Sequence, residues 1–384
     1  MERLGDIFNI SSGGTPNKNE TSYYENGTIP WVKTGDLKAK YVSEDVECIT
    51  EEGMNNSSAK LFPRNTVLVA MYGATIGACS ILSYGASTNQ ACAAFLPRKD
   101  VLPEYLYYFL SSKKIQFIQD GVGGAQPNIS VGYLKKVKFD LLPIDRQQKI
   151  IDILNKVDDL ISFRKQQLSK LDEIVKSRFI ELFGLPGSDA FGWGLVPLGS
   201  VCDINPKKSQ DYRLSSGIEV SFVPMPAVTE RGEIDATAVK KYDEVKTGFT
   251  YFAENDVLFA KITPCMENGK GAVARGLHNG LGFGSTEFHV LRPISGKSNP
   301  YWVYTLTAFS QFREDAASNM TGSAGQRRVP ASFLENYLVA LPPIELQEQF
   351  ATFVEQTDKS KFEIQKSLEK LETLKKALMQ KYFG

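Results

Sequence analysis

Histidine and cysteine are scarce in this chain of 384 residues. The two histidines, His278 and His289, both stand in the second half. The five cysteines are scattered and show no C-x-x-C spacing: Cys48, Cys79, Cys92, Cys202 and Cys265. An odd, unpatterned set of this kind predicts reduced and mostly buried thiols rather than a disulfide framework or a zinc site.

Long apolar runs and an excess of charge are also missing. No run reaches the roughly 18 residues that a membrane span needs, and the N-terminal residues show no secretory signal pattern, so we expect a cytosolic protein. Basic and acidic residues balance at 44 each, with a net charge of +0. Because sequence-independent affinity for nucleic acid comes from neutralising phosphates, this balance argues against a protein that depends on phosphate contacts alone. The balance does not exclude local basic patches.

What the sequence does contain is a long internal repeat. LLPIDRQQKI at 141–150 returns as LPPIELQEQF at 341–350, and the likeness continues to the Phe-Gly pair that ends each copy. Upstream, LGDI at 4–7 matches LGSV at 198–201. The period is far above the ~20–50 residues of solenoid repeats. The repeat therefore predicts two domains related by pseudo-two-fold symmetry.

Each copy consists of a strand-rich part followed by a helical tail. Pro143 and Pro343 suit the first turn of a helix, and residues 185–194, rich in glycine and without periodicity, read as a connector. The predicted fold class is α+β, with two tandem mixed α/β domains, each followed by a long helix, and the two helices paired as an antiparallel coiled coil. The predicted boundaries are 1–142 for the first domain, 143–184 for the first helix, 185–342 for the second domain with its connector, and 343–384 for the second helix.

Both tails carry apolar residues at an alternating spacing of four and three, which predicts a heptad seam. The first seam is interrupted by Arg164 and Arg178, and the second by polar residues such as Lys361. About 40 residues at ~1.5 Å each give a rod of roughly 60 Å. The predicted apolar seam consists of Ile150, Leu154, Val157, Ile161, Leu168, Leu171, Val175 and Leu182 in the first helix and Phe350, Val354, Ile364, Leu368, Leu371, Leu378 and Tyr382 in the second.

The upstream parts contain short apolar runs among glycines, asparagines and prolines, as is typical of strands. Apolar and aromatic residues recur at helical spacing in two further places. We therefore predict strands at 66–70, 91–95, 219–223 and 256–260, and helices within 103–119 and 300–317.

Several strings resemble catalytic motifs, but none has the required spacing. GKS at 296–298 lacks the glycine that a phosphate-binding loop needs five positions earlier, where Leu291 stands. DLK at 36–38 has no counterpart in the second copy, and Glu267 and Lys270 are misspaced for a nuclease metal site. With histidines in one half only, neither a histidine-based triad nor a two-histidine metal site can be built symmetrically. We expect no catalytic activity, no metal and no cofactor.

Polar loops occupy matching places in the two copies. Their framework is shared while their side chains differ, as two domains would need if each read a different run of base edges. The alternative is that these are ordinary turns in which Asn, Gly and Pro serve the backbone geometry. The matching loops are 31–36 with 222–227, 71–77 with 261–270, and 123–130 with 322–330.

Several motifs in this order resemble the specificity subunit of type I restriction-modification systems. In the first copy they are LGDI, IPWVKTGDL, GATIG, STNQ, GAQPNIS, LPIDRQQKI and a long helix ending in ELFG. In the second copy they are AKITPCMENGK, TGSAGQRRVP and LPPIELQEQF. The resemblance covers essentially the whole chain.

The resemblance implies that each domain is a target recognition domain that reads one half of a bipartite site in double-stranded DNA. It implies that the long helices form a spacer and dock two methyltransferase subunits, which carry S-adenosylmethionine, and that restriction subunits, which combine a motor and a nuclease, join the complex. The chain itself would catalyse nothing. Helix length would then set the half-site spacing, as dimer geometry does in helix-turn-helix proteins.

We place the candidate DNA-binding residues in the polar loops, because amides can pair with adenine, lysine can reach guanine or phosphate, and carboxylates can accept from cytosine. In the first domain they are Lys33, Thr34, Asp36, Tyr72, Thr75, Asn89, Gln90, Gln126 and Asn128. In the second they are Lys261, Thr263, Glu267, Asn268, Lys270, Thr286, Glu287, Gln326, Arg327 and Arg328.

Two alternatives remain open at this point. A stand-alone DNA methyltransferase or nuclease would show turnover with DNA, Mg²⁺ and S-adenosylmethionine. A coiled-coil adaptor for protein partners would be indifferent to DNA sequence.

Overall fold

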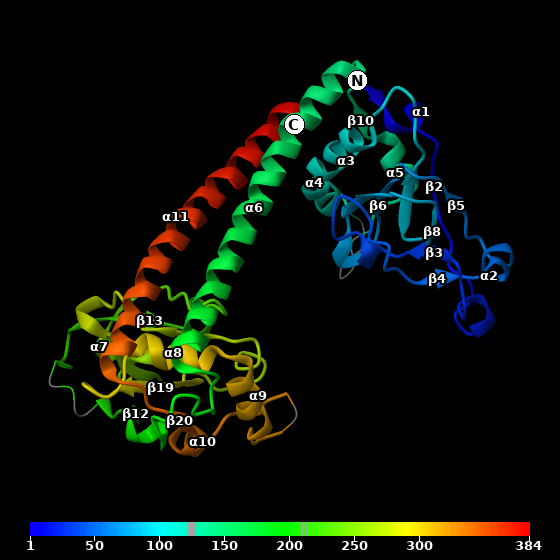
Figure 1. Ribbon diagram of the computed structural model, residues 1–384. Coiled ribbons are helices and arrows are strands. Elements are labelled where there is room, and N and C mark those ends of the chain that lie inside the picture. The colour runs from blue at the N-terminus through cyan, green and yellow to red at the C-terminus, as the bar shows by residue number, and fades with distance from the viewer. Residues whose placement is uncertain (122–127, 209–210, 212, 324) are drawn as a thin grey trace. The chain divides into compact units, whose positions relative to one another are not determined.

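The chain folds into two units, each containing part of both long helices. The computed structural model describes residues 1–121, 128–208, 211, 213–323 and 325–384. Unit 1 consists of Met1–Arg164 and Ser367–Gly384, and unit 2 of Lys165–Lys366. The long helices are α6 (Ile144–Phe183) and α11 (Ile344–Phe383) (Figure 1).

Unit 1 contains two four-stranded sheets and a short antiparallel ribbon. The first sheet is antiparallel throughout, in the order β2 (Ile10–Ser12), β9 (Cys92–Phe95), β6 (Val67–Ala70) and β7 (Cys79–Ile81). The second has the order β4 (Cys48–Ile49), β3 (Ile29–Val32), β8 (Ala86–Thr88) and β5 (Leu61–Phe62), and in it β3 and β8 run parallel. The ribbon pairs β1 (Glu2–Arg3) with β10 (Lys138–Phe139).

Unit 2 repeats this topology strand for strand. Its antiparallel sheet has the order β12 (Cys202–Ile204), β19 (Phe288–Pro293), β16 (Val257–Ala260) and β17 (Gly271–Val273). Its second sheet has the order β14 (Val239–Lys241), β13 (Glu219–Val223), β18 (Leu281–Gly284) and β15 (Thr250–Ala253), with β13 and β18 parallel. The ribbon pairs β11 (Leu195–Pro197) with β20 (Leu338–Ala340). The internal repeat of the sequence is thus a repeat of one fold.

Helical structure is present in both ranges predicted from apolar spacing, but each range divides into two helices. They are α3 (Pro103–Ser112) with α4 (Lys114–Gln119), and α8 (Pro300–Ala308) with α9 (Ser310–Ser318). Phe309 is extended, with φ −68° and ψ 143°, and its side chain is buried in the core, so the helix is interrupted there. The short helices are α1 (Leu4–Ile7), α2 (Glu51–Asn55), α5 (Val131–Lys136), α7 (Tyr242–Val245) and α10 (Ala331–Asn336).

The long helices complete the core of each unit. In unit 1, the ring of Phe383 packs 5.4 Å from Tyr105 and 6.2 Å from Phe109, centroid to centroid. In unit 2, Phe179 lies 5.5 Å from Phe350. Burial of such rings contributes most of the stability that an amphipathic helix gains from tertiary packing.

The two helices pair antiparallel. In unit 1 the early part of α6 shares a core cluster with the late part of α11, and in unit 2 the late part of α6 shares one with the early part of α11. Lys361 and Lys375, at polar positions of the second heptad pattern, form ion pairs across the helices with Asp172 at 2.7 Å and with Asp158 at 2.6 Å. Within the described residues, no helix combines the length and the apolar character that crossing a membrane requires.

The predicted seam residues differ in burial. Ile150, Leu154, Val157, Leu168, Val175, Phe350, Val354 and Leu368 are buried. Ile161, Leu171, Leu182, Ile364, Leu371, Leu378 and Tyr382 are half-buried. Phe179, Phe183 and Phe383, which the heptad count leaves out, are also buried, because the helix ends pack on the sheets and α3 or α8 as well as on each other.

A buried glutamine ties the start of each long helix to its domain. The side chain of Gln147 accepts from Leu102 N–H at 2.8 Å and donates to the carbonyls of Asp100 and Leu142 at 2.8 and 2.7 Å. Gln347 makes the same three bonds, to Asn299 N–H and to the carbonyls of Lys297 and Pro342, at 2.9, 3.1 and 2.9 Å. Each amide satisfies three backbone groups that would otherwise be buried unpaired. This explains why the glutamine recurs in the repeated motif.

We expect Gln147→Leu to lower the free energy of unfolding by roughly 2–3 kcal/mol, because buried backbone groups lose their partners. Gln347→Leu should cost a similar amount in unit 2. Denaturant unfolding of the full chain, followed by hydrogen exchange to assign each loss to its unit, measures both. The exposed neighbour Gln148 is the control, and Gln148→Leu should change stability by less than about 0.5 kcal/mol. Equal stability of wild type and Gln147→Leu would contradict the argument.

Candidate nucleic-acid interface

In unit 1, the ends of two parallel strands bring polar loops together. The N–H of Asn89, which follows β8, donates to the carbonyl of Val32 at the end of β3, at 3.0 Å. The turn that follows β3, residues 33–36, therefore lies beside Asn89. Within this turn the Asp36 carboxylate accepts from the Lys33 N–H at 2.8 Å.

The loop after β6 joins the same edge. Met71 N–H donates to the Ala91 carbonyl at 2.8 Å, and Ile129 N–H donates to the Met71 carbonyl at 2.9 Å. Tyr72 and Asn128 form the next backbone pair. Gln126 lies outside the described residues. The structure thus gathers the other predicted residues of unit 1 at one edge: Lys33, Thr34, Asp36, Tyr72, Thr75, Asn89, Gln90 and Asn128.

Some of these side chains already have partners within unit 1. Lys33 Nζ lies 2.7 Å from the Glu47 carboxylate, and this hydrogen bond raises the pKa of Lys33 above its usual value. The Thr15 hydroxyl donates to the side-chain oxygen of Gln90. By contrast, the buried Oδ1 of Asn89 finds no hydrogen-bond partner among the described residues, and Tyr72 is 44% exposed. The Tyr72 side chain is therefore accessible from outside, whereas the Asn89 oxygen is an unsatisfied acceptor below the surface.

Unit 2 builds the same edge with different side chains. Lys261, which follows β16, donates its N–H to the Glu287 carbonyl at 2.9 Å. Val329 N–H donates to the Lys261 carbonyl at 2.9 Å, and Thr263 N–H to the Arg327 carbonyl at 3.1 Å. The predicted residues of unit 2 gather around these contacts: Lys261, Thr263, Glu267, Asn268, Lys270, Thr286, Glu287, Gln326, Arg327 and Arg328.

Ion pairs neutralise the two arginines of this edge. The guanidinium of Arg328 holds Glu287 in a fork, with Nη2–Oε1 at 2.8 Å and Nε–Oε2 at 2.9 Å, which lowers the pKa of that carboxyl. Arg327 lies 3.6 Å from Glu267, and burial lowers the pKa of the half-buried Lys261. The sequence places two adjacent arginines here, and the structure shows both of them paired with carboxylates.

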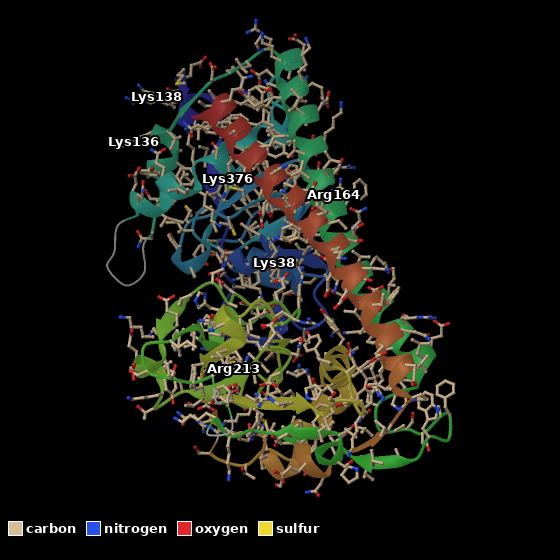
Figure 2. All side chains as sticks on the ribbon, turned by 90° about the vertical axis from the view of Figure 1, so that its left-hand side faces the viewer. Lys38, Lys136, Lys138, Arg164, Arg213 and Lys376 are labelled. Atoms are coloured by element: carbon tan, nitrogen blue, oxygen red, sulfur yellow. The ribbon has the colours of Figure 1, made fainter. Side chains whose placement is uncertain are left out.

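Lys38 is a candidate that sequence reasoning left out. Its side chain is exposed, directly after the turn at 33–36 (Figure 2). As part of the string DLK at 36–38, Lys38 fits no nuclease motif that the second copy repeats. Its position beside Lys33 and Asp36 was the signal that would have included it, because a basic residue next to a base-reading loop suits a phosphate contact.

The described residues contain no group of three or more His, Cys, Asp or Glu side chains that could hold a metal ion. All five cysteines are free. The ring of His289 is buried, with Nε2 2.8 Å from the Val329 carbonyl and Nδ1 3.0 Å from the Asn205 side chain, and burial lowers its pKa. This histidine is a neutral structural group.

Residues 1–173 and 191–376 both match the family model described as the type I restriction modification DNA specificity domain. The chain belongs to this family. The two matched segments correspond to the two copies of the internal repeat, so the chain carries the specificity domain twice.

Curated relatives are similar over different extents. The chain is 44% identical to the EcoEI specificity subunit and 42% identical to the EcoAI specificity subunit, both of Escherichia coli, over 40% and 41% of its own length. These matches span about a quarter of those two relatives, 25% and 26%. The chain is 24% identical to the MjaIX specificity subunit of Methanocaldococcus jannaschii. This match covers 99% of the chain and 91% of that relative.

Two solved structures share this fold. The type I restriction-modification S subunit from M. genitalium superposes with a TM-score of 0.53 at 14% identity, covering 100% of this chain and 95% of that one. A chain from a structure on complex assembly and conformational transition of the type I R-M system gives a TM-score of 0.58 at 17% identity, covering 99% and 96%. At such identities the likeness shows the fold, and the specificity domains here adopt it.

Glu287 is the subject of a pH prediction. Its pKa lies below the ordinary value of 4.5 in the folded protein, chiefly because of the Arg328 hydrogen bond. The pair therefore stabilises unit 2 above about pH 4.5, and this stabilisation is lost as the pH falls through the folded pKa. We expect Glu287→Gln to be less stable than wild type at neutral pH and the difference to shrink in acid. Denaturant unfolding across pH tests this, with exposed Glu335→Gln as control, and a pH-independent difference would refute the pairing.

Proposed function

We propose that this chain is the DNA-reading subunit of a type I restriction-modification complex and is not itself an enzyme. Unit 1 and unit 2 would each read one half of a bipartite site in double-stranded DNA in the cytoplasm. The observation that carries the proposal is the repeated sheet edge, where one framework presents different polar side chains in the two units. The residues of both edges, with the predicted sets above, are proposed as the DNA contacts.

The side chains at the two edges support different readings. Unit 1 offers amides, Asn89 and Asn128, which can make paired hydrogen bonds to adenine. Unit 2 offers Arg327 and Arg328, whose fork geometry suits guanine or phosphate. The Glu267 and Glu287 partners orient these arginines before DNA arrives, so less side-chain freedom is lost on binding.

We propose that α6 and α11 are the spacer between the recognition domains and the docking site for two methyltransferase subunits, with restriction subunits joining the same complex. Equivalent positions of the repeat carry exposed apolar side chains, Ile174 at 47% and Leu374 at 46%. Phe163 and Phe362 add exposed rings, at 59% and 65%. Exposed apolar residues on a helix surface are typical of protein contacts, and their pseudo-symmetric placement supports two equivalent partners.

The division into recognition domains at 1–142 and 185–342 and spacer helices at 143–184 and 343–384 belongs to the same proposal. Each domain would keep its sheets, its loops and the buried glutamine that follows it. Because that glutamine bonds only to its own unit, each domain would read DNA independently of the other.

Removing both arginines of unit 2 should weaken DNA binding across all sequences. We expect Arg327→Ala with Arg328→Ala to reduce affinity and to lower the slope of log K against log salt by about 1–2, since each phosphate contact contributes roughly 0.9. Binding titrations of the full chain at several salt concentrations measure both quantities.

The control for this variant is Lys246→Ala. Lys246 follows α7, and α7 begins beside Ile218. This is the end of β13 that lies opposite the polar edge of unit 2. Its loss should leave affinity and salt slope unchanged. If the double alanine variant also retained both, the arginines would be surface residues without a role in binding.

Shortening both helices tests the spacer. Deleting residues 161–167 and 361–367 removes one heptad from each helix, which keeps the seam in register and shortens the pair by about 7 × 1.5, or ~10 Å. This is close to three base pairs at ~3.4 Å each. We expect both half-site sequences to be retained and the gap between them to shrink, or binding to fail because the rotation about the duplex changes.

Selection from a DNA library with variable gap length measures this outcome, with the chain assembled with its methyltransferase. Modification of the original site at an unaltered rate would show that the helices hold partners without setting the spacing.

A further inference from the structure

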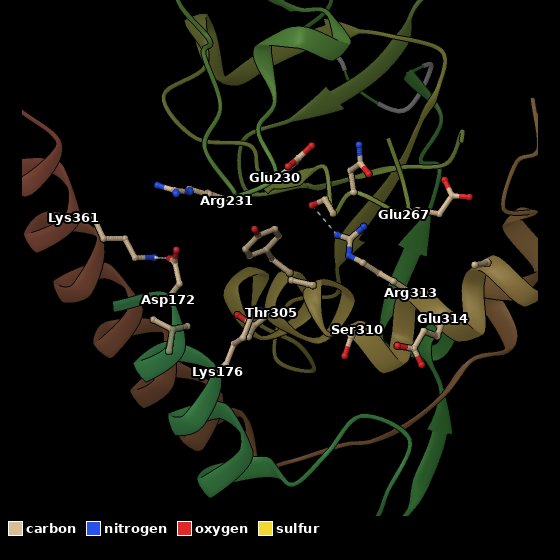
Figure 3. Close-up of a pocket in the computed structure, with 16 residues that line it drawn as sticks. Asp172, Lys176, Glu230, Arg231, Glu267, Thr305, Ser310, Arg313, Glu314 and Lys361 are labelled. Carbon is tan, nitrogen blue, oxygen red and sulfur yellow. Dashed lines mark hydrogen bonds and ion pairs between the residues drawn. The ribbon is translucent and has the colours of Figure 1, made fainter. Parts of the chain in front are cut away.

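Arg313 is a buried arginine to which the proposed function gives no role. It is 7% exposed, on α9 of unit 2. Its guanidinium points toward the loop that follows β16, residues 261–270, which carries the predicted contacts Glu267 and Asn268 (Figure 3). We propose that Arg313 is a positioning residue for half-site recognition by unit 2, holding this loop in its reading conformation. The inference rests on the proposed function.

The contacts of Arg313 go to the backbone of the loop. Nη1 donates to the Met266 carbonyl at 2.6 Å and Nη2 to the Gly269 carbonyl at 3.0 Å. These two carbonyls flank Glu267 and Asn268 in the sequence. The planar fork of an arginine can fix two acceptors at once, so a single side chain sets the path of the backbone on either side of the exposed residues.

An open cavity lies against this loop. Arg313, Asn268 and Gly269 line a cavity of about 440 Å³ beneath it. Gly269 has a φ of +93°, which a residue with a side chain rarely adopts, and a Cβ at this position would lie 3.9 Å from the guanidinium carbon of Arg313. Backbone hydrogen bonds such as Asn268 N–H to the Pro264 carbonyl at 2.9 Å close the loop on itself. Because an open cavity gives no packing support, Arg313 adds the hydrogen bonds that hold the loop from the side of the cavity.

Stability alone does not account for an arginine here. Burial lowers the pKa of Arg313 to about 10, and in the part of the chain that the structure describes its buried Nε has no hydrogen-bond partner. An apolar side chain of similar size would avoid this desolvation. Its guanidinium packs 5.4 Å from the Phe259 ring centroid, a contact that an apolar residue could also make.

Unit 1 has a different residue at the position equivalent to Arg313. The sequence Gln-Phe-Ile at 116–118 matches Gln-Phe-Arg at 311–313, and the phenylalanine is fully buried in both. The equivalent of Arg313 is thus Ile118, which is 44% exposed. Unit 1 also has a shorter loop after β6, closed by the Gly77 N–H to Ala70 carbonyl bond at 2.9 Å. The buried arginine is thus found in unit 2, where the loop after β16 is longer than the loop after β6 in unit 1.

The first test uses the chain alone. In Arg313→Ile, which installs the residue of unit 1, we expect the amides of Gly269 and Lys270 to exchange with solvent at least about tenfold faster, as local opening becomes easier. Arg313→Lys should lie between, since one ammonium cannot reproduce the fork, and it keeps the test valid if the isoleucine variant folds poorly. Unchanged exchange at both amides would overturn the inference without reference to DNA.

The second test uses the chain assembled with its methyltransferase and a DNA library in which one half-site at a time is randomised. We expect Arg313→Ile to reduce sequence preference at the half-site of unit 2 by roughly tenfold, the loss of about one base contact. Preference at the half-site of unit 1 should be unchanged. If wild type itself shows no preference at the half-site of unit 2, the proposed function fails, and the exchange measurement still decides the role of Arg313 in the loop.

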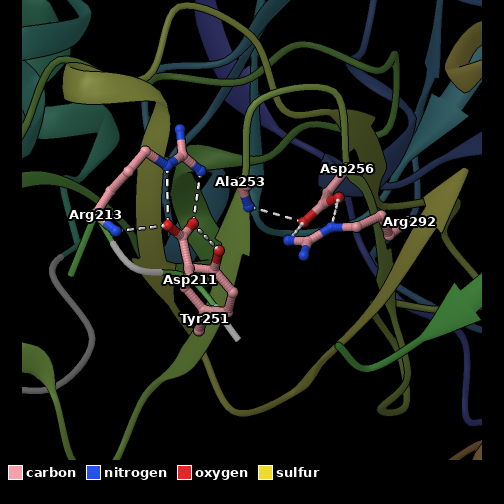
Figure 4. A network of polar contacts seen from close by, with 6 residues as sticks. All are labelled: Asp211, Arg213, Tyr251, Ala253, Asp256 and Arg292. Atoms are coloured by element: carbon pink, nitrogen blue, oxygen red, sulfur yellow. Dashed lines mark hydrogen bonds and ion pairs between the residues drawn. The ribbon is translucent and has the colours of Figure 1, made fainter. Parts of the chain in front are cut away.

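Arg292→Met is the matched control. Arg292 is an arginine of the same unit that holds the buried Asp256 carboxylate at 2.7 Å, and that carboxylate also accepts from Ala253 N–H (Figure 4). Its loss should lower the melting temperature at least as much as Arg313→Ile, yet leave sequence preference intact. If both variants lost preference equally, the effect of Arg313 would be general stability and the inference would be wrong.

Discussion

The junction between each domain and its long helix depends on one buried amide. Gln147 and Gln347 each satisfy three backbone groups: the N–H that precedes α3 or α8, a nearby loop carbonyl, and the carbonyl at the start of the helix. A buried amide with all three bonds fixes direction as well as distance, since hydrogen bonds lose strength quickly when bent. The amide thus fixes the start of each helix relative to α3 or α8, and the apolar residues of the helix that pack on the domain core add to this constraint.

The junction is the same in both units, but the side chains at the polar edges differ. The parallel pairs β3 with β8 and β13 with β18 place the same loops side by side in both units. Unit 1 fills these places with amides and a tyrosine, and unit 2 with two arginine–glutamate pairs. Loops on a rigid sheet tolerate such exchange because their side chains contribute little to the core. A fold that separates framework from contact residues can change its ligand while keeping its core.

The long helices, the repeat and the four strands at 66–70, 91–95, 219–223 and 256–260 could be predicted from the sequence, because they follow from internal similarity and local periodicity. The run at 219–223 coincides with β13, and the heptads predicted α6 and α11. Longer-range features could not be predicted. Nothing local marks the interruption of the helix at Phe309, the pairing of Arg328 with Glu287, or the reach of Arg313 to a loop more than forty residues earlier, since each depends on neighbours that only the folded chain supplies.

The shared helices also bear on the order in which the chain is made and folded. The core of unit 1 contains Phe383, with Leu378 and Tyr382 packed against it. Domains usually fold in order of synthesis as they leave the ribosome, but this one lacks part of its core until the last helix has been translated. Unit 2, at 165–366, is by then fully made. Of the two units, unit 1 is thus the first to begin synthesis and the last to be completed, and until α11 is made the apolar residues that it covers stay exposed.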